Sequence, residues 1–330
     1  MKGKKIFASL LLVFALVFVL SGSQVVSAEK KWPEGKISML VPYKAGGSSD
    51  AMARGLAKHW EKYLGVPIII DNRDGASSQV GTTIYSRMPA DGNTVYIGCQ
   101  TYFSGNIVTQ NAKYKAEDFE VINIQQEDLI EIAVMDNSPY KGNPKKLFEA
   151  IKANPGKLSC GYIAGGPQNI AASILQKSEG LNFKSVTYAS GNALRTALLG
   201  GHIDFMIGNG LGDLSVVGKA YPVVILGTKK SKLFPDVPVY KEVFGKNFPH
   251  LSMSTFVAVH KALKMNYPER FDKLVDTYKK VMNDKEYKKF LNESKQELIT
   301  QYIGPSASAK VMKDIEKLVN KYKDDLIVSN

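Results

Sequence analysis

The sequence predicts an α/β fold of two lobes, and three observations lead to this prediction. Short apolar stretches of strand length alternate along the chain with stretches whose apolar residues recur at helical spacing. This alternation is typical of α/β architecture. The alternation starts afresh after Asp136, which indicates a second unit of the same kind. Removal of a predicted signal peptide, residues 1–28, leaves 302 residues, a length that favours two domains over one.

The N-terminus has the three parts of a secretory signal peptide. Lys2, Lys4 and Lys5 precede the apolar run 6–20, and the small residues at 26–28 suit a signal peptidase. The apolar run is shorter than the roughly 20 residues of a spanning helix, and no later stretch is long and apolar enough to enter a bilayer. No cysteine near the cleavage site offers a lipid an attachment point. We therefore expect a soluble protein exported to the periplasm or the medium.

Composition narrows the classes of partner. The formal net charge is +12, but the lysines are scattered through helical stretches such as 278–289 and do not form one stripe with stacking aromatic residues. We therefore expect no nucleic-acid partner. Cys99 and Cys160 are the two cysteines of the chain, and the layout predicted below puts them in different lobes. A bond between them would lock a hinge that has to move, so we expect them unpaired.

Five apolar stretches predict the strands before Asp136. These strands are 37–41, 66–70, 94–98, 121–124 and 131–135. A helix over 50–60 follows the first strand, because its apolar residues recur at helical spacing.

The loop between the first strand and the first helix is predicted to bind an anion. Gly46 and Gly47 let the chain turn without a side chain in the way, so the first amides of the helix point outward with about half a positive charge. A carboxylate or phosphate docks readily at such a helix start. The alternative is a helix that Ser48, Ser49 or Asp50 simply caps. The segment 71–81 repeats the pattern of strand, glycine-bearing loop and helix. It therefore predicts a second set of helix-start amides that could bind an anion.

The second lobe is predicted to have the same organisation. Its elements are helix 144–153, strand 158–162, helix 170–178, strand 185–188, helix 193–199, and strands 203–207 and 223–226. The loop 163–169 resembles the first loop in architecture, and Pro167 suits a first helical position. Beyond these elements, amphipathic stripes predict three core-facing helices, 268–282, 284–291 and 306–326.

Six motifs, in order, resemble those of the substrate-binding proteins of tripartite tricarboxylate transporters, also called the Bug family. The resemblance covers nearly the whole mature chain. The six motifs are Val-Pro-Tyr-Lys-Ala-Gly-Gly-Ser-Ser-Asp at 41–50, Asn-Arg-Asp-Gly-Ala-Ser-Ser-Gln-Val-Gly at 72–81, Asp-Gly-Asn-Thr-Val at 91–95, Ala-Gly-Gly-Pro-Gln-Asn at 164–169, Leu-Gly-Gly-His-Ile-Asp at 199–204, and Phe-Pro-Asp-Val-Pro at 234–238 with Glu242 nearby.

The resemblance implies a two-lobed periplasmic-binding-protein fold of type II, with α/β lobes joined by hinge strands. Within this layout we place the crossings near Ala133 and near Ser254, so that residues 30–132 and 255–330 form lobe 1 and residues 133–254 form lobe 2. A small organic carboxylate is implied in the cleft, held largely by backbone amides and ordered water. The implied partners are the membrane subunits of the transporter, and the implied state is a monomer without cofactor or metal.

Carried over onto this chain, the resemblance gives a candidate set of ligand-binding residues. The set is Tyr43, Ala45, Gly46, Gly47, Ser48, Ser49, Asp50, Ser77, Ser78, Gln79, Thr101, Gly165, Gly166, Pro167, Gln168, Asn169, Tyr188 and Asp204. Four positions depart from the family pattern. Ser77-Ser78 stands where the family has Gly-Gly, Asn169 where it has His, and Ser190 where it has Gly. The two serines either bond a ligand directly or cap the following helix.

Two other function classes remain open alternatives. An enzyme is disfavoured because the sequence has neither Gly-x-Ser-x-Gly nor a phosphate-binding loop ending in Gly-Lys-Ser/Thr, and its four histidines lack zinc spacing. The run 208–212, Gly-Asn-Gly-Leu-Gly, is a weak nucleotide-like match with no predicted helix after it. A periplasmic sensor that presents its ligand to a signalling receptor fits the sequence as well as a transport protein does.

Overall fold

The structure, a computed structural model, describes residues 32–326. The chain divides into two compact units, one ending at Glu34 and the other beginning at Gly35. The fold described here is that of residues 35–326. The predicted signal peptide, residues 1–28, lies outside the described residues. None of the described helices has the length and apolar character that crossing a membrane demands.

The N-terminal elements alternate strand and helix as expected. They are β1 (Ile37–Val41), α2 (Ser48–Leu64), β2 (Ile68–Asn72), α3 (Gln79–Tyr85), β3 (Thr94–Cys99), α4 (Gln100–Thr109), the 3₁₀ turn η1 (Ala116–Asp118) and the long strand β4 (Phe119–Met135). We use "first lobe" for the part of the fold around β1, β2 and β3.

The middle of the chain builds a second set of strands and helices. These are α5 (Pro144–Ala153), β5 (Ser159–Ile163), α6 (Pro167–Lys177), β6 (Lys184–Tyr188), α7 (Gly191–Leu199), β7 (Phe205–Asn209), α8 (Gly210–Asp213), the 3₁₀ turn η2 (Leu214–Val216), β8 (Ala220–Ile225) and α9 (Tyr240–Phe244). We use "second lobe" for the part around β5, β6 and β7. The rest of the chain forms β9 (Ser252–His260), α10 (Lys261–Asn266), α11 (Pro268–Asn283), α12 (Lys285–Glu293), α13 (Gly304–Lys321) and α14 (Lys323–Leu326).

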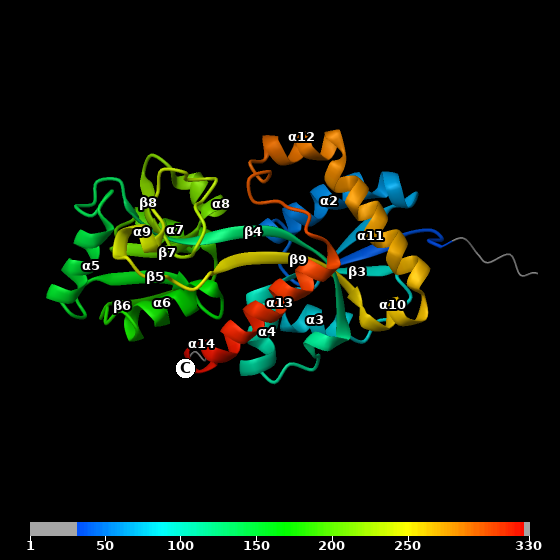
Figure 1. Ribbon diagram of the computed structural model, residues 1–330, viewed down its shortest axis with the longest axis horizontal. Coiled ribbons are helices and arrows are strands. Elements are labelled where there is room, and N and C mark those ends of the chain that lie inside the picture. The colour runs from blue at the N-terminus through cyan, green and yellow to red at the C-terminus, as the bar shows by residue number, and fades with distance from the viewer. Residues whose placement is uncertain (1–31, 327–330) are drawn as a thin grey trace, which may run out of the picture. The chain divides into compact units, whose positions relative to one another are not determined.

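The strands join into one sheet in which β4 and β9 connect the lobes (Figure 1). In the first lobe β1, β2 and β3 are parallel, and β9 pairs antiparallel to β3. Strand β4 pairs antiparallel with β9 up to Leu129 and with β7 from Ile130 onward. Strands β5 and β6 run parallel to β7. The carboxyl ends of β1–β3 therefore point toward the second lobe, and those of β5–β7 point toward the first.

Strand β4 is continuous where the sequence predicts two strands, 121–124 and 131–135, so that prediction was wrong. Polar residues fill the middle of β4 and hide its strand character. Their side chains are bonded inside the fold: Asn123 donates to the Gln301 carbonyl at 2.8 Å, and Gln126 donates to Gln296 at 2.7 Å. Two register shifts also interrupt its pairing with β9. Buried polar groups with partners of this kind are tolerated in a strand interior.

The helices α4, α8, α9 and α10 and the strand β9 were not predicted, and α8 begins within the run 208–212, where no helix was expected. The other helices and strands appear within a few residues of their predicted bounds. In α4 buried positions fall on most of its surface, including Thr101, Phe103 and Asn106. A helix covered on several sides has no apolar stripe set against a polar one, so its periodicity is hard to detect.

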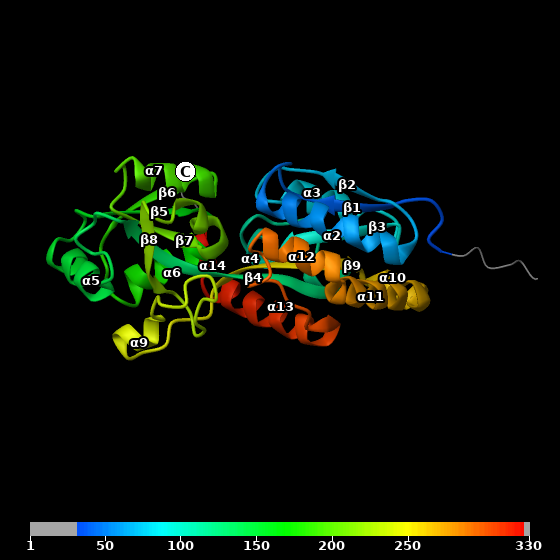
Figure 2. The ribbon, with the colours of Figure 1, turned by 90° about the horizontal axis from the view of Figure 1, so that it is seen from above.

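The C-terminal helices pack on both lobes. In the first lobe, aromatic residues such as Tyr96, Phe103 and Phe256 form the core. Val319 of α13 and Leu326 of α14 instead belong to the apolar cluster of the second lobe, together with Ile170 and Leu175 of α6. Figure 2 shows α13 alongside β4 and α14 beside the second lobe. The division that gives residues 255–330 to lobe 1 remains a prediction, and these two contacts depart from it.

Both cysteines lie in the described part of the chain and are free and buried, in agreement with the expectation that they do not pair. Cys99 ends β3 in the first lobe, and Cys160 lies in β5 of the second.

We predict that Asn123→Ala lowers the free energy of unfolding by about 3 kcal/mol, because it removes a buried amide whose partners then stay unsatisfied. Besides its bond to Gln301, Asn123 accepts the backbone N–H groups of Ile303 and Gly304 at 2.9 and 3.1 Å. Urea unfolding of the variant measures the change. The exposed Asn320→Ala is the control, and an equal loss in both variants would contradict the assignment.

Candidate functional site

Six helices begin at the two facing edges of the sheet. Helices α2, α3 and α4 follow the carboxyl ends of β1, β2 and β3, while α6, α7 and α8 follow those of β5, β6 and β7. Ligands of open α/β sheets bind outside the carboxyl ends of the strands. The region between these helix starts is therefore the candidate binding cleft.

Asp50 holds the loop between β1 and α2, the first loop, from the interior of the protein. Its buried carboxylate accepts the backbone N–H of Gly46 at 2.8 Å, Nε of Arg54 at 2.9 Å and Nδ2 of Asn72 at 3.0 Å. Burial would raise the pKa of the Asp50 carboxyl, but these hydrogen bonds lower the pKa below its usual value. Asp50 therefore fixes the loop, and Arg54 and Asn72 are supporting residues that the sequence analysis did not single out. The spacing of four residues between Asp50 and Arg54 was the available signal.

Helix α2 begins without the cap that the alternative interpretation required. Its N-cap residue is Gly47, and none of the described side chains caps the helix there. Ala45 to Ser48 are exposed, and Ser49 is half-buried. The N–H groups of a first helical turn have no partner within the helix. Those of α2 therefore lie at the candidate cleft.

The loop between β2 and α3, the second loop, has a strained backbone. Ala76, Ser77 and Ser78 have φ angles of +45°, +50° and +82°. The left-handed region costs a residue with a side chain on the order of 1 kcal/mol. Ser78 occupies the N-cap position of α3, but no cap bond from its side chain exists in the described structure. Its hydroxyl instead accepts from Asn106 of α4 at 3.3 Å, and the Gln79 side chain donates to the Gln110 carbonyl at 3.0 Å.

Helix α4 adds a third helix start on the first lobe. The hydroxyl of Tyr43 accepts the backbone N–H of Cys99 at 2.9 Å, which ties the first loop to this helix. Thr101 is buried in the first turn. Burial raises the pKa of the Cys99 thiol to about 12, so the thiol stays neutral. Tyr43 and Thr101 thus belong to the wall of the candidate cleft on this side.

The loop of the second lobe repeats the arrangement of the first. Asn169 accepts the backbone N–H of Gly165 at 3.1 Å through its side-chain oxygen, four residues ahead, as Asp50 does for Gly46. Helix α6 begins at Pro167, as predicted, and its N-cap Gly166 gives no side-chain cap. Gln168 is fully buried, and its amide group makes no hydrogen bond to any residue the structure describes. A buried amide in this state is free for a ligand group or a water.

The two lobes meet at these loops. A Cβ atom added to Gly166 would lie 2.7 Å from the hydroxyl oxygen of Tyr102, which belongs to the first turn of α4. One added to Gly105 would lie 3.5 Å from the Gly165 carbonyl oxygen. Tyr102 therefore faces the start of α6 across the candidate cleft.

The predicted site residues Tyr188 and Asp204 lie at opposite ends of the strands of the second lobe. Tyr188 ends β6 at the cleft edge, and Ser190 just after it accepts the backbone N–H of Ala193, capping α7. Asp204 precedes β7, at the opposite end of the sheet from Gly165–Asn169, and its carboxylate accepts the backbone N–H of Ser159 at 2.7 Å. A strand of five residues spans about 15 Å. Asp204 caps a strand start and does not join the other predicted residues.

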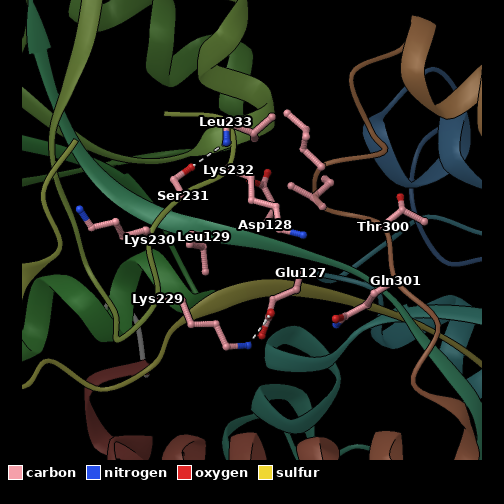
Figure 3. Close-up of a pocket in the computed structure, with 12 residues that line it drawn as sticks. Glu127, Asp128, Leu129, Lys229, Lys230, Ser231, Lys232, Leu233, Thr300 and Gln301 are labelled. Atoms are coloured by element: carbon pink, nitrogen blue, oxygen red, sulfur yellow. Dashed lines mark hydrogen bonds and ion pairs between the residues drawn. The ribbon is translucent and has the colours of Figure 1, made fainter. Parts of the chain in front are cut away.

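A separate pocket of about 100 Å³ opens over the middle of β4 (Figure 3). Its lining consists of residues 127–129, 229–233 and 298–301, and includes none of the predicted ligand-binding residues. Glu127 bonds Nζ of Lys229 at 2.9 Å and Nε2 of His250 at 2.8 Å. Burial opposes ionisation, but bonds from His250 and Lys229 lower the pKa of Glu127 to about 2. Lys229, Lys230 and Lys232 line this pocket, and the Glu127 carboxylate neutralises part of their positive charge.

We predict that Asp50→Ala lowers the free energy of unfolding by about 2 kcal/mol, because the Gly46 N–H loses its acceptor and the Asn72 amide keeps only the Tyr43 carbonyl. Chemical denaturation measures the loss. Asp71→Ala serves as the control, because the Asp71 carboxylate pairs with an exposed arginine at the surface. If Asp50→Ala costs no more stability than Asp71→Ala, Asp50 does not hold the loop.

Comparison with known proteins places the chain in a family. The model of the tripartite tricarboxylate transporter family receptor matches residues 52–324. BugT of Bordetella pertussis is 27% identical over 262 residues, which are 76% of this chain and 77% of BugT. Two solved structures from Rhodopseudomonas palustris share the fold. MatC with bound malate is 18% identical with a TM-score of 0.72, and the match covers 90% of this chain and 100% of MatC. Rpa4515 with adipate is 20% identical with a TM-score of 0.74, and the match covers 89% of this chain and 97% of Rpa4515. The chain therefore belongs to the family of tripartite tricarboxylate transporter receptors, which are solute-binding proteins.

Proposed function

We propose that the protein is a periplasmic receptor that captures a small organic carboxylate between its lobes and delivers it to the membrane subunits of a tripartite tricarboxylate transporter. Family membership supports the transport role. Solved relatives that hold malate and adipate support a carboxylate as the ligand.

The observation that carries the proposal is the set of uncapped helix starts at the facing sheet edges of the two lobes. In the described structure, α2 and α4 in the first lobe and α6 in the second all begin without a side-chain cap. Their first amides carry partial positive charge and suit a carboxylate. The buried amide of Gln168 adds a further group without a protein partner in the described part of the chain.

The energies are sufficient for a useful affinity. A charge-assisted hydrogen bond contributes about 1.5 to 3 kcal/mol. Micromolar affinity needs about 8 kcal/mol net. Amides from both lobes, with Gln168, reach this value after the costs of ordering and of moving the lobes together.

The proposed mechanism is closure of two lobes, residues 30–132 with 255–330 and residues 133–254. A ligand that contacts both lobes binds the closed form better than an open one, and so shifts the population toward closure. The membrane subunits would then recognise the closed form. No catalytic step is part of this function.

The proposed binding site consists of the predicted residues without Asp204, and only some of them contact the ligand directly. Asp50 and Asn169 act from behind the loops, since their side-chain oxygens accept N–H groups of their own loops. Direct contacts are assigned to the loop 45–49, to Thr101 and Tyr188, and to Gly166 and Gln168. The protein acts as a monomer, without cofactor or metal.

Calorimetric titration with malate, adipate and citrate tests the ligand class, with the uncharged diamide of adipic acid as the control. We expect at least one acid to bind with a micromolar dissociation constant and the diamide not to bind, because only the carboxylate is charged. Mass spectrometry of small molecules released from the purified protein extends the test to other acids. Binding of none of these acids, with no acid released, would remove the proposal.

We predict that Gly166→Leu weakens binding of the acid at least about tenfold, a loss of about 1.4 kcal/mol, because its side chain collides with Tyr102 and fills the cleft. The backbone of Gly166 has φ of −109°, which any residue adopts, so the fold should survive. Gly105→Ala is the matched control, since its added methyl group meets only ordinary contacts across the same interface. Equal affinities of the two variants would show that Gly166 does not line the binding site.

A further inference from the structure

A buried group of charged residues lies behind the cleft wall of the second lobe. Asp128 and Glu131 belong to β4, Asp213 ends α8, and Arg195 lies on α7. The three carboxyl-bearing residues are at most 5% exposed. They lie beside the glycine-rich run 208–212, which forms the end of β7 and most of α8, and a Cβ on Gly208 would collide with Asp213 Oδ2.

Two of these carboxyl groups have clear partners. Asp128 accepts Nδ2 of Asn209 at 2.5 Å and the backbone N–H of Leu211 at 3.0 Å. It therefore holds the first turn of α8. Asp213 accepts Nη1 of Arg195 at 3.2 Å, and the same guanidinium donates to Asn192 at 2.8 Å.

Glu131 is the exception. It has no exposed surface, and neither carboxylate oxygen has a hydrogen-bond donor among the described residues. Asp213 Oδ2 also lacks a donor there. Glu131 pairs in register with Gly208, and Asp213 Oδ2 lies against Gly208, so the two carboxyl groups are neighbours. Two carboxylates in contact repel each other, whereas one proton turns the contact into a strong O–H···O bond. Three carboxyl groups facing one guanidinium also leave excess negative charge, which is costly to bury.

We propose that Glu131 keeps its proton at neutral pH and donates it to Asp213, and that this shared proton positions the starts of α7 and α8 for ligand binding. Glu131 is thus a positioning residue. The inference rests on the proposed function only in its last part, the effect on the cleft.

The surroundings determine the direction in which pH acts. Burial raises the pKa of Glu131 well above its usual value, and the charges of Asp213 and Asp128 add to the rise. Burial also raises the pKa of Asp128 to about 7. The charged groups facing Glu131 are Asp128 on its own strand, Asp213 on α8 and, paired with Asp213, Arg195 on α7.

A carboxyl group whose pKa is raised by folding stabilises the fold below its unfolded-state pKa, and this contribution is lost as pH rises through the folded value. The free energy of unfolding should therefore fall above about pH 4.5, the unfolded-state value for Glu131. The proposed proton at neutral pH requires that this fall extend past neutrality. Asp128 contributes its own decrease up to about pH 7.

The network reaches the cleft through α7 and α8. Asn192 lies in the first turn of α7, just after Tyr188 and the cap Ser190. Leu211 lies in α8, directly after the carboxyl end of β7. Loss of the proton would place two adjacent negative charges beside the run 208–212, and the starts of α7 and α8 would move to separate them.

Glu131→Gln tests the proposal because glutamine keeps a donor for Asp213 and cannot ionise. Glu120→Gln is the matched control, a change on the same strand at an ion pair with Lys261 and Lys264. Infrared spectroscopy at neutral pH should show a protonated carboxyl group in the full-length protein and in the control variant that Glu131→Gln lacks. The decrease of unfolding free energy above neutral pH should be smaller in Glu131→Gln than in the other two proteins. Identical infrared spectra or identical pH profiles would overturn the shared proton.

The effect on the cleft is measured with adipate as the probe. Between about pH 6 and about pH 9 we expect the affinity for adipate to fall about fivefold or more in the natural protein and in Glu120→Gln, a coupling of ordinary size, and to stay nearly constant in Glu131→Gln. Equal pH profiles would overturn the positioning role. If adipate binds to none of the three proteins, the proposed ligand class fails for this acid, while the infrared and unfolding measurements still decide whether the proton is shared.

Discussion

The antiparallel pairing of β4 determines where this protein places its helix starts. Strand β4 runs from the first lobe into the second and pairs antiparallel with β9 along one part and with β7 along the other. Every parallel strand of each lobe takes its direction from one of these partners. The carboxyl ends of both sets must then face one another, and the helix starts that follow them face the same gap. If β4 paired parallel with β7, the helix starts of the second lobe would lie at its far edge.

A bare helix start needs support from elsewhere, and the two main loops obtain it in the same way. Asp50 and Asn169 each accept an N–H four residues earlier, so the glycine loop is fixed by a side chain that belongs to the helix itself. These two side chains bond the loop from the interior of the protein, so the first N–H groups of α2 and α6 stay available on the side of the candidate cleft. A serine or threonine cap would have occupied one of those amides.

The sequence predicted much of this fold and less of the chemistry behind it. Helical periodicity located α2, α5 and α11 because each has one buried and one more polar face, and short apolar runs located β1 and β3, which are buried on both faces. It failed for α4, which is buried on several sides, and for the middle of β4, whose polar residues find partners far along the chain, such as Asn123 with Gln301. Local patterns cannot report such distant partners. The loop motifs identified Gly46 and Gly166, whereas the role of Asp50 as a brace and the burial of Glu131 depend on tertiary contacts.

The C-terminal helices give the lobes a third connection. Helix α13 begins beside Asn123 in the first lobe, and Val319 and Leu326 end in the apolar cluster of the second. Two neighbouring strands alone would permit both bending and torsion about their common axis. A packed helix set to one side of that axis resists torsion and leaves bending as the softer mode. Val319 and Leu326 thereby limit the mechanical freedom of the molecule, although they lie far along the sequence from every loop of the cleft.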